Sequence, residues 1–402
     1  MNRKIPIPKL NRPWILLGLL VALGALSGCA EDRSDGSAQK GRGGNGSASA
    51  DGSLGAFAPP KDPGRGGFLV TVSGEDLASV GYDWRPGITA KAPAFVDGWA
   101  LKFEHVLITV DTLSVNEDPD RNEGDPRQLG AAVASARGPW AIDAAIGGDV
   151  IGKSGEKAVA IAAFSEQASG AAFDPESTYA FSYDLVSASA DAKWVNLDAS
   201  GQALYEEAIR KGWSMVLDGT ATYNGPEGSS VFAKMPKELH FTLGLTNPSS
   251  YVNCRNTDLT EVGGEFPRGI KASAEQSQTV QITIHTDHVF WDTLNVEGAQ
   301  LHFDPIAALS SNYGSPDAAG QVTNEDLASA DVSGFKTRDG DPLPARSLVP
   351  DYEAPAGQLR YDTNGTSLKS VNSFLSFLSF SAASGGHLNA DGECEIKNNF
   401  TP

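Results

Sequence analysis

The sequence predicts a mainly β fold: an antiparallel β-sandwich-like body with a few short peripheral helices. Three segments alternate apolar with polar or small residues at a period of two, residues 179–185, 239–245 and 280–284. This alternation is typical of strands that have one face in a core, as in antiparallel sheets. Glycine is abundant, with 44 residues, and charged residues make up only 20%, which suits a turn-rich β protein.

Helical patterns are fewer and shorter. Residues 204–211 predict a helix that ends at Gly212, a residue type common at helix C-termini. Thr323-Asn-Glu-Asp326 has the form of a capping box that opens a short helix. A third pattern is an apolar stripe that stops before Gly385-Gly386, formed by Leu368, Val371, Leu375 and Leu378.

The N-terminus has the pattern of an export signal. Four basic residues precede an apolar run from Trp14 to Leu26. This run is shorter than the roughly 20 residues that a transmembrane helix needs. The run ends in Leu26-Ser27-Gly28-Cys29, which resembles the lipobox of bacterial lipoproteins. The resemblance implies cleavage before Cys29, acylation of that residue and anchoring to the lipid bilayer, since each buried methylene contributes about 0.8 kcal/mol.

The residue after Cys29 is Ala30 rather than Asp. By resemblance to the sorting rules of Gram-negative bacteria, this favours the outer membrane, with either the periplasmic or the exterior face open. The predicted organisation is therefore a signal peptide at 1–28, a flexible Gly/Ser-rich tether at 29–67, and a β-rich body at 68–402. The body is either one large domain or two packed subdomains with a break near residue 235.

Charge and hydropathy exclude some partners. The chain has a formal net charge of −19, and the leader carries four basic and no acidic residues, so the mature chain (31 − 4 basic, 50 acidic) has −23. A body this acidic repels phosphate backbones, which makes nucleic acid an unsuitable partner. No second segment is long and apolar enough to span a bilayer.

Two cysteines remain once Cys29 is lipidated. An even pair in an oxidising compartment predicts one disulfide between Cys254 and Cys394. It closes a loop worth about 5 kcal/mol in the chain-entropy model. No C-x-x-C pattern is present, which favours a structural role over redox chemistry.

The densest group of chemically useful residues is His285-Thr-Asp287-His288-Val-Phe-Trp-Asp292. If the chain turns helically after Ile284, His285, His288 and Asp292 share one face at spacings of three and four. Imidazoles with a carboxylate suit a transition metal such as Zn or Cu. If the strand continues, His285 and Asp287 share a face instead and form a structural hydrogen-bonded pair.

A second feature is the segment Trp99–Val110. Apolar residues occupy the odd-numbered positions up to Phe103 and the even-numbered positions from Val106 onward. This shift of one residue predicts a β-bulge at Glu104–His105. Such a bulge either bends the strand at a corner of the sandwich or re-aims His105 as a distant fourth ligand for the His285 group.

Common catalytic motifs are absent. The sequence contains no nucleophile elbow, P-loop, dinucleotide glycine fingerprint, H-E-x-x-H or C-x-x-C-H. The acidic segment starting at Asp118 fails the EF-hand pattern, because its sixth and twelfth positions are Glu123 and Leu129.

Several segments resemble a family of exported lipoproteins typical of myxobacteria and their relatives. They cover most of the chain from about Phe68 onward and include Asp97-Gly-Trp99, Gly138-Pro-Trp140, Ser250-Tyr-Val-Asn-Cys254, Thr283-Ile-His285-Thr-Asp287-His288-Val-Phe-Trp291 and Gly386-His387-Leu-Asn389-Ala-Asp391-Gly392-Glu-Cys394. The resemblance implies export and lipid anchoring but no particular activity. After Trp140 the family pattern leads us to expect a His, where this chain has Asp143-Ala-Ala145.

These observations predict a membrane-anchored lipoprotein that serves as a binding module, with a transition-metal site at His285, His288, Asp292 and His105. The competing interpretation is a structural or interaction protein of the cell envelope in which the histidines brace a turn. An enzyme of an unfamiliar type is a third, and no residue of the sequence is assigned a catalytic role.

Overall fold

The computed structural model describes residues 57–84, 94–122, 124–225, 235–291, 300–330, 361–362 and 373–400. The chain divides into two units, Met1–Gly52 and Ser53–Pro402, and every described residue belongs to the second. Cys29, Asp292, Leu368 and Val371 lie outside the described residues.

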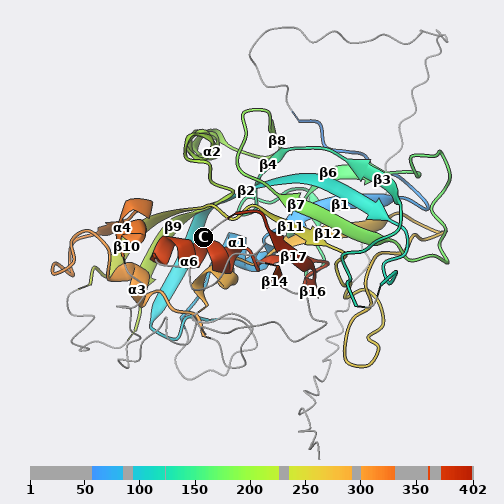
Figure 1. The fold of residues 1–402 in the computed structure, drawn as a ribbon. Helices are drawn as coiled ribbons and strands as arrows, with labels where there is room; N and C mark the ends of the chain where they lie inside the picture. The colour runs from blue at the N-terminus through green and yellow to red at the C-terminus, as the bar shows by residue number, and fades with distance from the viewer. Residues whose placement is uncertain are drawn as a thin grey trace, which may run out of the picture. The chain divides into compact units, whose positions relative to one another are not determined.

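The described part is mainly β, as the sequence predicts, and contains two sheets (Figure 1). The six-stranded sheet has the order β16-β15-β12-β1-β6-β5 and consists of β1 (Phe68–Ser73), β5 (Val150–Ile151), β6 (Lys157–Phe164), β12 (Gln278–Ile284), β15 (Gly386–Leu388) and β16 (Gly392–Glu393).

The eleven-stranded sheet has the central order β13-β10-β9-β2-β7-β11-β17-β14, with β3 and β4 paired to β2 and β8 paired to β4. Its strands are β2 (Trp99–Asn116), β3 (Ala132–Ala136), β4 (Trp140–Asp143), β7 (Ala180–Leu185), β8 (Lys193–Trp194), β9 (Met215–Tyr223), β10 (Glu238–Leu245), β11 (Ser249–Val252), β13 (Gly320–Val322), β14 (Tyr361–Asp362) and β17 (Glu395–Asn398).

Most strand pairs are antiparallel, but both sheets are mixed. Among the described residues, β1 runs parallel to β12, β10 to β13, β4 to β8 and β14 to β17. Strand β10 pairs with β9, so the strands on either side of residue 235 belong to the same sheet.

The helical elements are short and stand outside the sheets. They are α1 (Glu75–Val80), α2 (Ala199–Lys211), the 3-10 helix η2 (Thr286–Phe290), α3 (Asp304–Ala307), α4 (Asn324–Ser329) and α6 (Phe374–Ala382). No described helix is long and apolar enough to cross a membrane.

Two helix ends confirm the local signals in the sequence. Helix α2 ends at Gly212, which adopts the left-handed conformation at φ 73° as a C-cap. Helix α4 begins with the predicted capping box, in which the side chains of Thr323 and Asp326 reach each other's backbone amides. Partners for the free amides at the start of α4 and for the free carbonyls at the end of α2 define where these helices begin and end.

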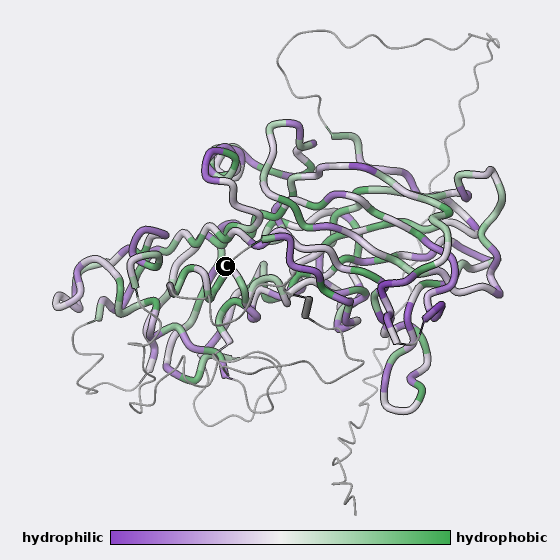
Figure 2. Tube along the Cα trace, in the orientation of Figure 1, coloured by the Kyte–Doolittle hydropathy of each residue, from purple (hydrophilic) through white to green (hydrophobic). Residues whose placement is uncertain are grey.

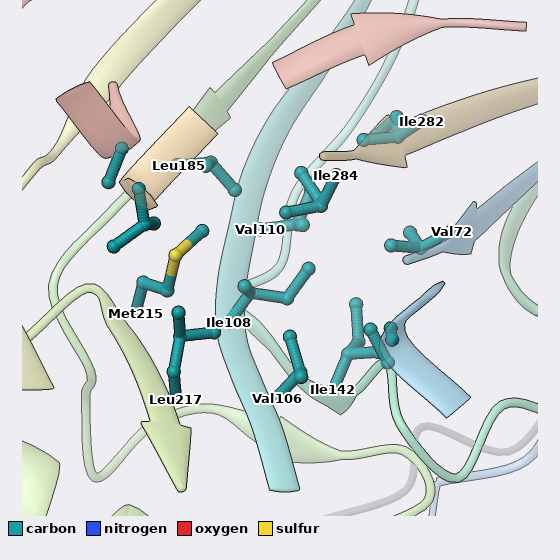
Figure 3. Packing of buried hydrophobic residues seen from close by; sticks show 14 of the residues in the cluster. Val72, Val106, Ile108, Val110, Ile142, Leu185, Met215, Leu217, Ile282 and Ile284 are labelled. Carbon is teal, nitrogen blue, oxygen red and sulfur yellow. The ribbon is translucent and has the colours of Figure 1, made fainter. Parts of the chain in front are cut away.

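The main core lies between the two sheets. Figure 3 shows Val72 and Ile282 of the six-stranded sheet in the same apolar cluster as Ile108 and Leu217 of the other. Along β12 the even-numbered residues Val280 to Ile284 enter this core, so the odd-numbered residues face the other way. Figure 2 shows hydrophobic residues along the paired strands and hydrophilic residues in many of the connecting loops.

The predicted bulge is present in β2. The pairing of β2 with β9 shifts register between Phe103 and His105. Beyond it, Leu107 points away from the main core and packs with Tyr205 and Ala208 of α2 in a second apolar cluster. The eleven-stranded sheet therefore buries both of its faces at this point.

Candidate metal centre

The centre forms where two parallel strands end. Ser73 of β1 pairs with Thr283 of β12, so the residues that follow these strands leave the sheet at the same edge. Glu75 follows β1 and His285 follows β12, and the Glu75 Oε1 atom lies 3.8 Å from His285 Nε2.

The third strand at this edge is β15. Thr283 pairs with His387 in antiparallel register, and His285 donates its backbone N–H to the carbonyl of Gly385 at 2.8 Å. Residues directly opposite in an antiparallel pair point to the same face, and so do residues two apart on one strand. His285 and His387 are therefore brought to the same face of the sheet, the one opposite the core.

After His285 the chain turns into the 3-10 helix η2, which confirms the helical alternative over a continued strand. His285 is the extended N-cap residue of this helix and His288 lies within its turn, and their ring centroids are 5.5 Å apart. Val289 and Phe290 are buried, with the Phe290 ring 5.3 Å from that of Phe95. The turn is thus fixed against the core.

Three imidazole rings meet at this place. The ring centroids lie 5.5 Å apart for His285 and His288, 4.3 Å for His285 and His387, and 5.2 Å for His288 and His387. One ring nitrogen from each lies within 4.8 Å of the other two. We refer to these three residues as the three-histidine cluster. This spacing is compatible with a shared metal ion.

Two of the rings are oriented by hydrogen bonds. The hydroxyl of Ser384 donates to the carbonyl of Ser381 at 2.7 Å, so its oxygen accepts from Nδ1–H of His288 at 2.8 Å. His285 donates from Nε2 to the carbonyl of Ala390 at 3.2 Å. Each ring therefore keeps one nitrogen with a free lone pair, the arrangement found when a histidine ligates a metal.

The third ring, that of His387, is not oriented by hydrogen bonds of good geometry. Both ring nitrogens of His387 are buried, and neither has a hydrogen-bond partner of good geometry, although the backbone of Ser384 and Asp391 lies near the ring. A buried polar atom without a partner costs about 1–3 kcal/mol. A metal ion bound to one of the two nitrogens would remove this cost at that nitrogen.

Burial lowers the pKa of two of these histidines. It lowers the pKa of His288 to about 4, and the pKa of His387 falls well below its usual value, with the neighbouring imidazoles adding to the effect. Both rings are therefore neutral near pH 7, which is the protonation state that a metal ligand needs.

Carboxylates surround the cluster. Burial raises the pKa of Glu75, opposed by His285 and reinforced by the charges of Asp391 and Asp287. Asp287 Oδ1 lies 3.9 Å from His285 Nδ1. Nearby negative charges that repel each other in a partly buried place favour a cation between them.

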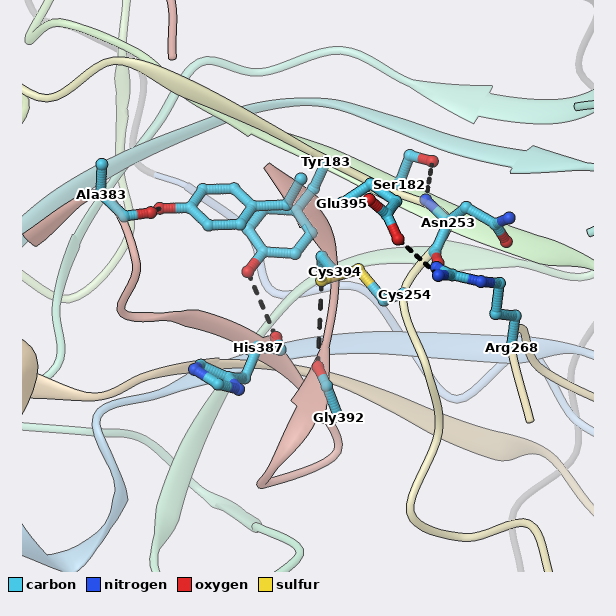
Figure 4. Close-up of a disulfide and its surroundings, with 11 residues drawn as sticks. Ser182, Tyr183, Asn253, Cys254, Arg268, Ala383, His387, Gly392, Cys394 and Glu395 are labelled. Atoms are coloured by element: carbon cyan, nitrogen blue, oxygen red, sulfur yellow. Dashed lines mark hydrogen bonds and ion pairs between the residues drawn. A yellow bond between two sulfur atoms is a disulfide. The ribbon is translucent and has the colours of Figure 1, made fainter. Parts of the chain in front are cut away.

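Close backbone packing holds His387 in place. A Cβ atom added at Gly386 would lie 2.3 Å from the Tyr251 ring, so glycine is needed where β15 passes the stacked rings of Tyr183 and Tyr251. The Tyr183 hydroxyl donates to the carbonyl of His387 at 3.2 Å (Figure 4). The loop after β15 is tied down by Asn389, which accepts from the backbone N–H of Gln281 at 2.8 Å.

The predicted disulfide between Cys254 and Cys394 is present, with the sulfurs 1.99 Å and the Cα atoms 3.9 Å apart (Figure 4). It joins Cys254, two residues after the end of β11, to Cys394, the residue between β16 and β17. Cys394 also lines the cavity beside the three-histidine cluster. The disulfide therefore fixes the C-terminal segment that carries His387.

The fourth ligand expected from the sequence is not His105. The β-bulge turns this side chain toward Asp143, whose Oδ2 lies 2.6 Å from His105 Nδ1. Asp143 is fully buried and also accepts from the backbone N–H groups of Val106 and Ala145, both at 3.0 Å. His105 is thus a structural pair with Asp143, and Asp292 is outside the described residues.

The sequence reasoning missed His387 as a ligand. It is nearly 100 residues from His288, and only the pairing of β12 with β15 brings the two together. The signal available was the pair of glycines directly before it, since glycine in a strand often marks a close approach of another chain segment.

No protein-family model matches the chain, and no curated protein or solved structure shows a significant similarity to it. The function is therefore inferred from the geometry of the site.

Proposed function

We propose that this chain is an exported lipoprotein that binds one divalent transition-metal ion, Zn²⁺ or Cu²⁺, through His285, His288 and His387. The observation that carries the proposal is the convergence of three ring nitrogens within 4.8 Å, one of them on the His387 ring, which makes no hydrogen bond of good geometry. Imidazole nitrogen suits both ions.

The ligand count favours a centre with an open position. Structural zinc sites are closed by four protein ligands, whereas three protein ligands leave room for water or a bound molecule. The three-histidine cluster faces a cavity of about 360 Å³, so the open position is directed into space and not into the core.

Binding of Zn²⁺ to the full chain, measured by isothermal titration calorimetry, tests the metal site. We expect one ion per chain, and an affinity at least about 100-fold lower in His288→Ala and His387→Ala, because loss of a ligand costs more than loss of an outer hydrogen bond. His240→Ala is the control. His240, Glu104 and Asp218 form a separate and more exposed group of potential metal ligands, so replacing His240 should leave the affinity of the three-histidine cluster unchanged. Equal affinities in all three variants would contradict the proposal, and lower stability without any metal binding would favour a bracing role.

The lipid anchor has its own test. We expect Cys29→Ala to abolish incorporation of a fatty-acid analogue, because Cys29 ends the lipobox-like Leu26–Cys29 segment. Unchanged incorporation in the variant would exclude this residue as the acylation site without affecting the metal proposal.

A further inference from the structure

The cavity beside the three-histidine cluster is larger than a metal ion and its waters need. Its volume of about 360 Å³ falls within the range of small-molecule sites. Leu77 of α1, Trp291 after η2 and Ile396 of β17 supply an apolar wall. Trp291 is held in place by its ring, which packs 3.9 Å from the ring of His288.

The remaining wall is acidic. Glu75, Asp287, Asp391 and Glu393 line the cavity, and no Lys or Arg does so among the residues described around it. Four carboxylates outnumber the two positive charges of a divalent ion. A purely anionic ligand would therefore be repelled, although the metal offers it a bond.

The carboxylates and the rings are close enough to act on one small molecule. One ligand atom from each of Glu75, His285 and Asp391 lies within 4.8 Å of the others, and His285 also belongs to the three-histidine cluster. A molecule bound to the metal by one end would have its other end beside Glu75 and Asp391.

From this arrangement we infer that the metal-loaded cavity binds a small zwitterion of the amino-acid class. Its carboxylate bonds to the open position of the metal, and its ammonium group donates to Glu75 and Asp391. A short apolar side chain packs on Leu77, Trp291 and Ile396. The inference rests on the proposed metal site and adds the class of ligand.

The test uses the full chain loaded with Co²⁺, whose absorption spectrum reports a new metal ligand. The probes are L-alanine, propionate, which lacks the amine, and ethylamine, which lacks the carboxylate. We expect L-alanine to change the spectrum with an affinity at least about tenfold higher than that of either partial analogue, because only L-alanine engages the metal and the carboxylates together. Equal effects of propionate and L-alanine would overturn the inference.

Two variants separate this inference from the metal site. Glu75→Gln removes the charge at nearly the same size and should weaken L-alanine binding about tenfold, the loss expected for one charge-assisted hydrogen bond. Leu77→Trp fills the apolar side of the cavity and should abolish L-alanine binding while Co²⁺ remains bound. Co²⁺ binding without any response to L-alanine would end this inference alone, whereas failure to bind Co²⁺ would end both proposals.

Discussion

The bulge in β2 and the end of β12 both carry buried imidazole rings. The two places differ in the hydrogen-bond partners of these rings and in the direction in which their pKa values shift. His105 has a buried carboxylate as its partner, and its hydrogen bond to Asp143 raises the pKa of His105. In the three-histidine cluster burial lowers the pKa of His288, and both nitrogens of His387 lack a hydrogen-bond partner of good geometry. A histidine that serves stability is paired, and a group of histidines left partly unpaired indicates a ligand site.

The backbone beside the three-histidine cluster is strained. Beside the three-histidine cluster, Glu75, Asn389 and Ala390 adopt positive φ angles of 55°, 49° and 70°. An alanine in the left-handed region costs about 1–2 kcal/mol. The carbonyl of Ala390 accepts from His285, and its N–H donates to the Thr283 hydroxyl. The strained backbone at Ala390 therefore helps to hold the His285 ring in position.

The largest expected effect is the loss of stability in Asp143→Ala. Removing one partner of a buried charged pair leaves the other uncompensated, so the free energy of unfolding should fall by about 3–5 kcal/mol. Zn²⁺ affinity should stay unchanged, because His105 is not part of the three-histidine cluster. Urea unfolding and calorimetry measure the two quantities. A large fall in Zn²⁺ affinity in the folded variant would remove the distinction between the two regions.

The pH dependence of the metal-free protein should have opposite signs in the two regions. The pKa of His288 falls from 6.5 to about 4 on folding, so below pH 6.5 the unfolded chain binds more protons. Stability is therefore lost as the pH falls toward 4, by about 3 kcal/mol from this residue. The raised pKa of His105 contributes stability below pH 6.5, and this is lost as the pH rises through the folded value.

Unfolding curves of wild type, His288→Ala and His105→Ala between about pH 4 and 8, in the presence of a chelator, check these signs. Replacing His288 should reduce the acid loss, and replacing His105 should increase it. The same pH profile in both variants would show that the two environments do not differ as described.

A smaller effect is expected from the outer hydrogen bond of the three-histidine cluster. Ser384→Ala removes the acceptor of His288 Nδ1–H, and Zn²⁺ affinity should fall about 10–100-fold. Ser381→Ala is a matched control on the same segment, because the buried hydroxyl of Ser381 has no hydrogen-bond partner. Equal affinities of the two variants would show that Ser384 does not orient the ring.

The sequence predicted the local elements better than their pairing. The alternation in residues 280–284, the bulge at Glu104–His105 and the C-cap at Gly212 depend on neighbouring residues, and the structure contains all three. The parallel pairing of β1 with β12 joins segments that are far apart in the chain, Phe68 with Gln278, and no local pattern encodes it.

In the candidate site, too, the sequence predicted what depends on neighbouring residues and missed what depends on distant ones. His285 and His288 were found because one short turn carries both. His105 was proposed as a ligand because a bulge re-aims a side chain, but the direction depends on Asp143 of β4. His387 was missed because its position is set by β15 and by the disulfide at Cys394, and both depend on partners distant in the sequence.

The central claim is that His285, His288 and His387 bind one metal ion together. Zinc K-edge X-ray absorption of the Zn²⁺-loaded full chain tests it most directly. We predict three imidazole nitrogens at about 2.0–2.1 Å with one further light-atom ligand, and one imidazole fewer in His387→Ala. A zinc environment without three imidazoles, or one that is the same in wild type and His387→Ala, would contradict the claim.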